Sequence, residues 1–147
     1  GVPVMSLVAA VKSGRRSVRN RAELLGWLEA EGRARSSHYA ELDFERPLRE
    51  QAALLSSASL LVASAGSSQF SGLFLAAGAG LLALPMCVSA KGPGQVDCHA
   101  EQLLAEGGLR WEQYPVNWND LFYVIGRGFE YLVHQEVVER LVHQLLD

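Results

Sequence analysis

The chain has 147 residues, 49% of them hydrophobic, and a formal net charge of -3. We expect a single domain over residues 1–147, because this length is typical of one domain with a real hydrophobic core. The charge argues against a general nucleic-acid binder, and no apolar run reaches the roughly 18 residues that span a bilayer. Since the chain begins at Gly1, we expect a processed chain or a piece of a longer protein.

The first predicted element is a buried strand over residues 2–11, which are apolar and partly β-branched. A loop over residues 12–20 follows, and it carries most of a basic run that contains no acid. Such a run fits a local site for a phosphate or sugar phosphate, and it fits a solvated basic loop equally well. The run consists of Lys12, Arg15, Arg16, Arg19 and Arg21.

Two helices and a short strand are predicted next. Residues 22–31 predict a helix for which Gly32 offers a natural end. Residues 37–42 predict a short strand, and residues 43–57 hold a second helix. The apolar faces of the two helices consist of Leu24, Leu25 and Leu28 in the first and of Leu48, Ala52 and Leu55 in the second.

A turn of small residues lies between two buried strands in the middle of the chain. Residues 59–64 and 80–85 are apolar, as expected where helices cover both faces of a parallel sheet. Residues 69–76 predict a short helix, so the turn at 64–68 joins the carboxyl end of a strand to a helix. Open α/β sheets bind ligands there, and a phosphate suits the N–H groups of such a turn. A packing turn without a ligand explains the same residues equally well.

The last third of the chain predicts two further helices and an edge strand. The first helix covers residues 100–106, the strand covers 110–116, and an amphipathic C-terminal helix covers 129–146. We expect the histidines of this last helix to be surface or cap residues. The alternation of strands and helices predicts a three-layer Rossmann-like α/β domain with a mainly parallel sheet of four or five strands.

Cysteines and histidines predict no metal centre. Cys87 and Cys98 flank a loop rich in Gly and Pro, and they fit a disulfide in a secretory compartment or two free thiols. The four histidines share no i, i+4 spacing, which makes a zinc site unlikely to form. No Asp-X-Asp motif appears, so we expect neither a metal nor another cofactor.

Three sequence blocks follow one another in a specific order over roughly residues 2–86. The first is RRSVRNRAEL at residues 15–24, and the second covers residues 49–58. The third is LLVASAGS at residues 60–67 followed by LFLAAGA at residues 73–79. Together they resemble the C-terminal half of glycosyltransferase family sixty-one. That family includes plant xylan arabinosyl- and xylosyltransferases and animal protein O-linked N-acetylglucosaminyltransferases.

This resemblance implies an inverting transferase with two domains of the GT-B type, of which this chain is the donor-binding half. The small-residue turn would then lie against the diphosphate of a nucleotide-sugar donor, without a metal. The acceptor, a glycan or protein, and the usual catalytic base would be held largely by an N-terminal domain or partner chain. The resemblance also implies the lumen of the ER or Golgi. The expected donor-binding residues are Arg15, Arg16, Arg19, Ser64, Gly66, Ser67 and Ser68.

Two departures from the family pattern support a different hypothesis. The family has His before the Gly of the turn and Glu in the following strand, where this chain has Ala65 and Ala83. These replacements remove polar groups from the expected donor site, so a catalytically inactive binding or scaffold domain is the alternative. An unrelated Rossmann-like enzyme is a weaker hypothesis, because no GxGxxG follows the first strand. No catalytic residue is assigned from the sequence.

Overall fold

The central element of the fold is a parallel sheet of five strands. The computed structural model describes residues 6–13, 18–64, 71–84, 108–115, 117–126 and 128–147. Within them, the strand order is β2-β1-β3-β4-β5, and every neighbouring pair is parallel. The predicted mainly parallel sheet of four or five strands is therefore confirmed, and β1, β3 and β4 are adjacent in it. The strands are β1 (Ser6–Ala10), β2 (His38–Glu41), β3 (Leu60–Ala63), β4 (Gly80–Ala83) and β5 (Arg110–Gln113).

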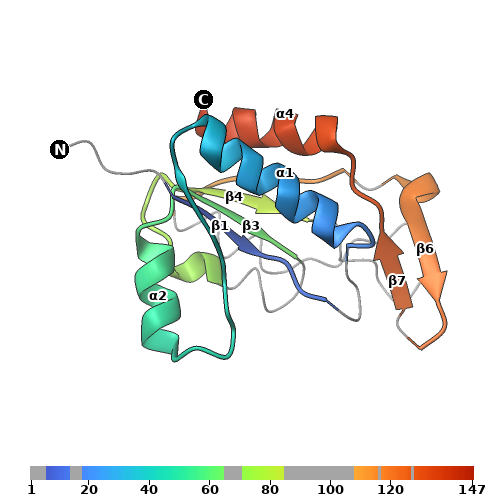
Figure 1. Ribbon diagram of the computed structural model, residues 1–147, viewed down its shortest axis with the longest axis horizontal. Helices are drawn as coiled ribbons and strands as arrows, with labels where there is room; N and C mark the ends of the chain where they lie inside the picture. Colours follow the sequence, from blue (N-terminus) through green and yellow to red (C-terminus); the bar gives the residue numbers. More distant parts are fainter. Residues whose placement is uncertain (1–5, 14–17, 65–70, 85–107, 116, 127) are drawn as a thin grey trace.

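Helices cover both faces of this sheet (Figure 1). The helices α1 (Arg21–Ala34) and α4 (Gln135–Leu146) lie on one face, and α2 (Leu48–Ser56) lies on the other. The predicted three-layer, Rossmann-like α/β fold with an amphipathic C-terminal helix is thus confirmed. Among the described residues, no helix is long and apolar enough to cross a membrane.

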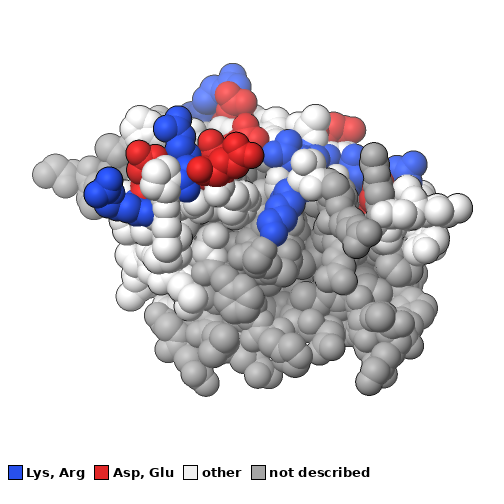
Figure 2. Space-filling view, turned by 90° about the horizontal axis from the view of Figure 1, so that it is seen from below, with Lys and Arg blue, Asp and Glu red and all other residues white. Residues whose placement is uncertain are grey.

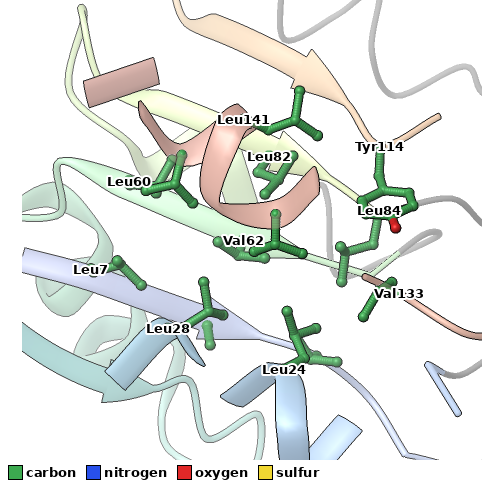
Figure 3. Packing of buried hydrophobic residues seen from close by; sticks show 14 of the residues in the cluster. Leu7, Leu24, Leu28, Leu60, Val62, Leu82, Leu84, Tyr114, Val133 and Leu141 are labelled. Atoms are coloured by element: carbon green, nitrogen blue, oxygen red, sulfur yellow. The ribbon is translucent and has the colours of Figure 1, made fainter. Parts of the chain in front are cut away.

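The core consists of two layers because successive strand residues point to opposite faces of the sheet. In β1, Leu7 faces α1 and α4, whereas Val8 faces α2, and both are at most 1% exposed. Figure 3 shows Leu60, Val62 and Leu82 of the sheet packed beneath the helices on the first face. The near-continuous apolar runs of β1, β3 and β4 are needed because these central strands are buried on both faces of the sheet.

The first residues of the predicted C-terminal helix belong to a two-stranded antiparallel hairpin. It consists of β6 (Leu121–Val124) and β7 (Gly128–Tyr131), and it follows a short 3-10 helix, η2 (Trp118–Asp120). The helix predicted from residue 129 begins only at Gln135. The apolar residues of β7 continue the helical spacing of α4. The periodicity of the sequence therefore does not show where the strand ends and the helix begins.

Gly32 was expected to end the first helix, and this expectation is wrong. The helix continues to Ala34, and the left-handed residue after it is Ser36, with φ 54°. Gly32 is buried inside the helix near β2, where an added Cβ would make ordinary van der Waals contact with the Cβ of Tyr39 at 3.4 Å.

Two further predictions about helices need correction. Leu48 was expected on the buried face of α2, but it is the first residue of that helix and is 64% exposed. Only the C-terminal part of α2, through Leu55, packs fully on the sheet. In the predicted helix at 69–76, residues 71–74 form a 3-10 turn, and Leu73 is 62% exposed. Without a buried apolar face, this segment has little to stabilise an α-helix.

Several predictions fall on residues outside the described ones. They concern the helix at 100–106, Cys87 and Cys98, and the replacement at Ala65. The other two short strands of the sequence analysis are confirmed. Residues 37–42 contain β2, and residues 110–116 contain β5, which forms an edge of the sheet as expected.

Candidate functional site

The strand order places the candidate site between the carboxyl ends of β1 and β3. From β1 the chain first adds β2 on one side, and it then adds β3, β4 and β5 on the other side. The connections that leave β1 and β3 therefore diverge, and ligands of open α/β sheets bind in the crevice at such a switch point. The predicted basic loop follows β1 and the predicted small-residue turn follows β3, so both begin at this edge.

Ser64, the first residue after β3, joins the two strands at this point. Its hydroxyl accepts a hydrogen bond from the backbone N–H of Lys12 (3.0 Å) and donates to the carbonyl of Ala10 (3.3 Å). Its own backbone N–H also donates to Ala10 (3.0 Å), and the residue is 1% exposed. The hydroxyl thus holds the starts of both loops together. Direct contact between Ser64 and a donor stays a prediction.

Two residues of the basic run hold the base of the β1 loop. The Nε of Arg21 donates to the carbonyl of Val11 (2.8 Å), and its guanidinium pairs with Glu41 at the end of β2 (3.4 Å). The ammonium group of Lys12 lies 5.6 Å from the centre of the Phe44 ring. Part of the basic run therefore stabilises the edge of the sheet and is not simply solvated.

Arg19 connects the other end of this loop to the β6–β7 hairpin. Its guanidinium lies 4.3 Å from the centre of the Phe122 ring in β6, and its backbone N–H donates to the carbonyl of Tyr131 in β7. Val18 also forms a parallel bridge with Tyr131. Stacking uses the flat face of a guanidinium, whereas its N–H donors point outward along the edge. Arg19 is thus oriented by the hairpin while its donors suit an anion.

A polar cluster beside the hairpin was missed by the sequence analysis. The side chain of Asn20 donates to the carbonyl of Val133 (2.8 Å) and accepts from its N–H (3.0 Å). The next N–H, of His134, donates to the hydroxyl of Tyr114 (2.8 Å), and the His134 ring pairs with Asp120 at 3.0 Å. No local sequence motif predicts these contacts, because Asn20 and Val133 are 113 positions apart.

Electrostatic effects in this cluster differ between its two titratable rings. Burial raises the pKa of Tyr114 above its ordinary value. The hydrogen bond that His134 donates to Asp120 raises the pKa of His134, because a nearby carboxylate favours the charged imidazolium. The cluster therefore contains one neutral phenol and one imidazole whose positive charge is favoured.

Five of the seven predicted donor-binding residues lie outside the described residues, and only Arg19 and Ser64 are described. These two follow the adjacent strands β1 and β3, respectively. On the face seen in Figure 2, basic and acidic side chains are intermixed along one side, without a patch of a single sign in the described part. Within the described ranges, no group of three or more His, Cys, Asp or Glu residues is arranged to hold a metal ion. The unplaced predicted residues are Arg15, Arg16, Gly66, Ser67 and Ser68.

Comparison with known proteins gives one family match. The family model described as Glycosyltransferase 61 matches residues 7–82, slightly more than half of the chain. The matched region runs from β1 into β4, so it contains both strands of the switch point. No curated protein matches the chain. His134, Asp120 and Tyr114 of the polar cluster lie beyond the matched residues, whereas Asn20 lies within them.

Proposed function

We propose, from the premise that this chain belongs to glycosyltransferase family 61, that it binds the nucleotide-sugar donor for transfer of the sugar to a glycan or protein acceptor. The observation that carries this proposal is the switch point between β1 and β3, which lies inside the family match. The carboxyl edge of a parallel sheet is where such folds bind nucleotides.

The chemistry of the two loops fits a diphosphate. Arg19 supports this, because its stacked guanidinium offers paired donors in a fixed direction. Ser64 supports it indirectly, because its three hydrogen bonds anchor the start of the turn whose backbone N–H groups are proposed to bind the phosphates. We extend the proposal to Arg15 and Arg16 of the same loop and to the turn at residues 66–68.

Transfer also needs an acceptor site, which we assign to an N-terminal domain or a partner chain. We further propose that the protein acts in the secretory pathway, in the lumen of the ER or Golgi, as suggested by its family. No metal or other cofactor is included in the proposal, because backbone N–H groups and arginines suffice to bind a diphosphate.

The second candidate function is a binding or scaffold domain without catalysis. Ala83 favours it, because this residue ends β4 at the same edge of the sheet and is fully buried with only a methyl side chain. If the aligned family residue is Glu, this chain lacks a carboxylate there that could accept a hydrogen bond from a donor hydroxyl. The replacement at Ala65 would remove a second polar group.

Calorimetric titration with a panel of UDP- and GDP-sugars tests the proposal. We expect one of these donors to bind the full-length protein, and Arg19→Ala and Gly66→Val to weaken that binding about tenfold or more. A charge-assisted hydrogen bond is worth roughly 1.5–3 kcal/mol, which is about one to two decades in Kd.

Arg33→Ala is the matched control, because Arg33 is an exposed arginine of α1 that pairs only with Glu29 among the described residues. This variant should bind like the wild type. Failure of every nucleotide sugar to bind the wild-type protein at millimolar concentration would refute donor binding and support the scaffold function.

A further inference from the structure

His134 and Asp120 form an ion pair that the proposed donor site has not used. His134 Nε2 lies 3.0 Å from Asp120 Oδ2, and the two side chains are 41% and 17% exposed. His134 immediately precedes α4, but its side chain makes no capping hydrogen bond with that helix. The imidazole is thus directed to the carboxylate of η2, and the side chain stays partly accessible to solvent.

Two side chains, those of Tyr114 and Asn20, hold the backbone around His134. Its N–H donates to the hydroxyl of Tyr114 (2.8 Å), and Tyr114 in turn donates its N–H to Ala83 (2.8 Å), extending the ladder at the carboxyl edge. Asn20, just before α1, binds both backbone groups of the preceding residue, Val133. These contacts place His134 at the same edge of the sheet as the candidate site, on a rigid support. Figure 3 shows Tyr114 and Val133 together beside Leu84, which follows β4.

The surrounding charges favour the protonated ring. Asp120 raises the pKa of His134 through its hydrogen bond, and Glu136 on the first turn of α4 raises it further, while partial burial opposes them. Tyr114 contributes a neutral hydroxyl, because burial raises its pKa, and Arg140 of α4 acts on that phenol in the opposite direction. The net effect keeps the imidazolium present at a higher pH than for an ordinary histidine.

We propose that His134, as an imidazolium oriented by Asp120, donates its Nδ1–H to the diphosphate of a nucleotide sugar. A neutral ring that gives its one N–H to Asp120 would present a lone pair at Nδ1 and repel a phosphate oxygen. The protonated ring presents a second N–H, so anion binding requires protonation. This inference rests on the proposed function, and it assigns a phosphate contact outside the residues that match the family.

Calorimetry from pH 6 to pH 9 tests the inference with the tightest-binding nucleotide sugar of the panel. The diphosphate of a nucleotide sugar is esterified at both ends and does not titrate in this range, so the pH dependence belongs to the protein. We expect wild-type binding to weaken as the pH rises through the pKa of His134. His134→Gln should bind about tenfold more weakly at pH 6 and should lose this pH dependence.

Asp120→Asn separates an electrostatic role from a structural one. It lowers the pKa of His134, so binding should be weaker than wild type at pH 7.5 and should recover toward the wild-type value at pH 6. A variant that merely disturbs the fold would not recover in this way. His143→Gln is the matched control, because His143 of α4 is likewise paired with carboxylates, Glu31 at 3.5 Å and Asp147 at 3.6 Å. It should leave binding unchanged.

Imidazole NMR supplies a second readout that does not depend on affinity. Saturation with the nucleotide sugar should raise the pKa of His134 by about one unit if binding prefers the imidazolium tenfold. An unchanged pKa, or equal binding by wild type and His134→Gln, overturns the inference and leaves donor binding intact. If no nucleotide sugar binds the wild-type protein, the proposed function fails and the inference is rejected with it.

Discussion

Removal of the Asn20 side chain should lower the stability of the domain, because Asn20 binds the chain just before α4. It makes two hydrogen bonds to the backbone of Val133, at 2.8 and 3.0 Å, in a partly buried position. A buried backbone group left without a partner costs about 1–3 kcal/mol, but water can reach a partly buried one. We therefore expect Asn20→Ala to lower the free energy of unfolding by about 2 kcal/mol. For a domain of this size, this corresponds to a Tm lower by about 4–8 °C.

Urea unfolding followed by circular dichroism measures this loss as a shift of the midpoint at constant slope. Asn20→Asp keeps an acceptor for the N–H of Val133 but places a second oxygen against its carbonyl, so it should be about as destabilising. Asn119→Ala removes an exposed asparagine and is the control, with an expected change within about 0.5 kcal/mol. A loss below about 0.5 kcal/mol for Asn20→Ala would refute the reasoning that this residue clamps the chain before α4.

Leu61→Ala and Leu82→Ala should each cost about 2–5 kcal/mol in urea unfolding, because both residues are fully buried in the central sheet; a cost under 0.5 kcal/mol would contradict their place in the core. Ser64→Ala should cost about 1–2 kcal/mol by the same measurement, since it removes the hydroxyl that joins β1 to β3, and an unchanged midpoint would count against that link. Burial raises the pKa of Tyr39 to about 12. The neutral phenol is therefore favoured in the folded state, and its contribution to stability is complete below pH 10 and lost as the pH rises from about 10 to 12. The Tyr39 hydroxyl has no hydrogen-bond partner among the described residues, so Tyr39→Phe should be neutral or slightly stabilising at pH 7 and should remove this alkaline loss. Tyr114→Phe, which loses the bond to His134, should be destabilising by about 1 kcal/mol, and the opposite ranking of the two variants would show that the hydroxyls are placed wrongly.

The sheet was predictable from the sequence because its signal is local. Each of β1, β3 and β4 is a short run of apolar residues, and such a run is required when helices cover both faces of a strand. The alternation of these runs with helical segments predicts parallel neighbours, and the family resemblance rests on the same region. The switch point and the two loops that leave it follow from that order of elements.

Helix boundaries were less predictable because competing local features share one periodicity. Gly32 has the residue type of a helix end, but α1 continues past it to Ala34, and Gly32 is buried near Tyr39 of β2. The apolar residues of β7 continue the spacing of α4, and only pairing with β6 shows that they form a strand. For β7, a contact with another element decided between two local conformations that the sequence allowed.

The sequence by itself thus determined the class of fold, the central strands and the family. Only the tertiary structure decided how individual polar side chains are used. Arg19 stacks on Phe122, Asn20 binds Val133, and His134 pairs with Asp120, and none of these pairs has a spacing that marks it in the sequence. The physical reason is that hydrogen bonds and ring contacts between distant segments form only after the sheet and helices have brought their backbones together. The sequence therefore gives the chemical groups of a polar residue, whereas the tertiary structure determines which residue it contacts.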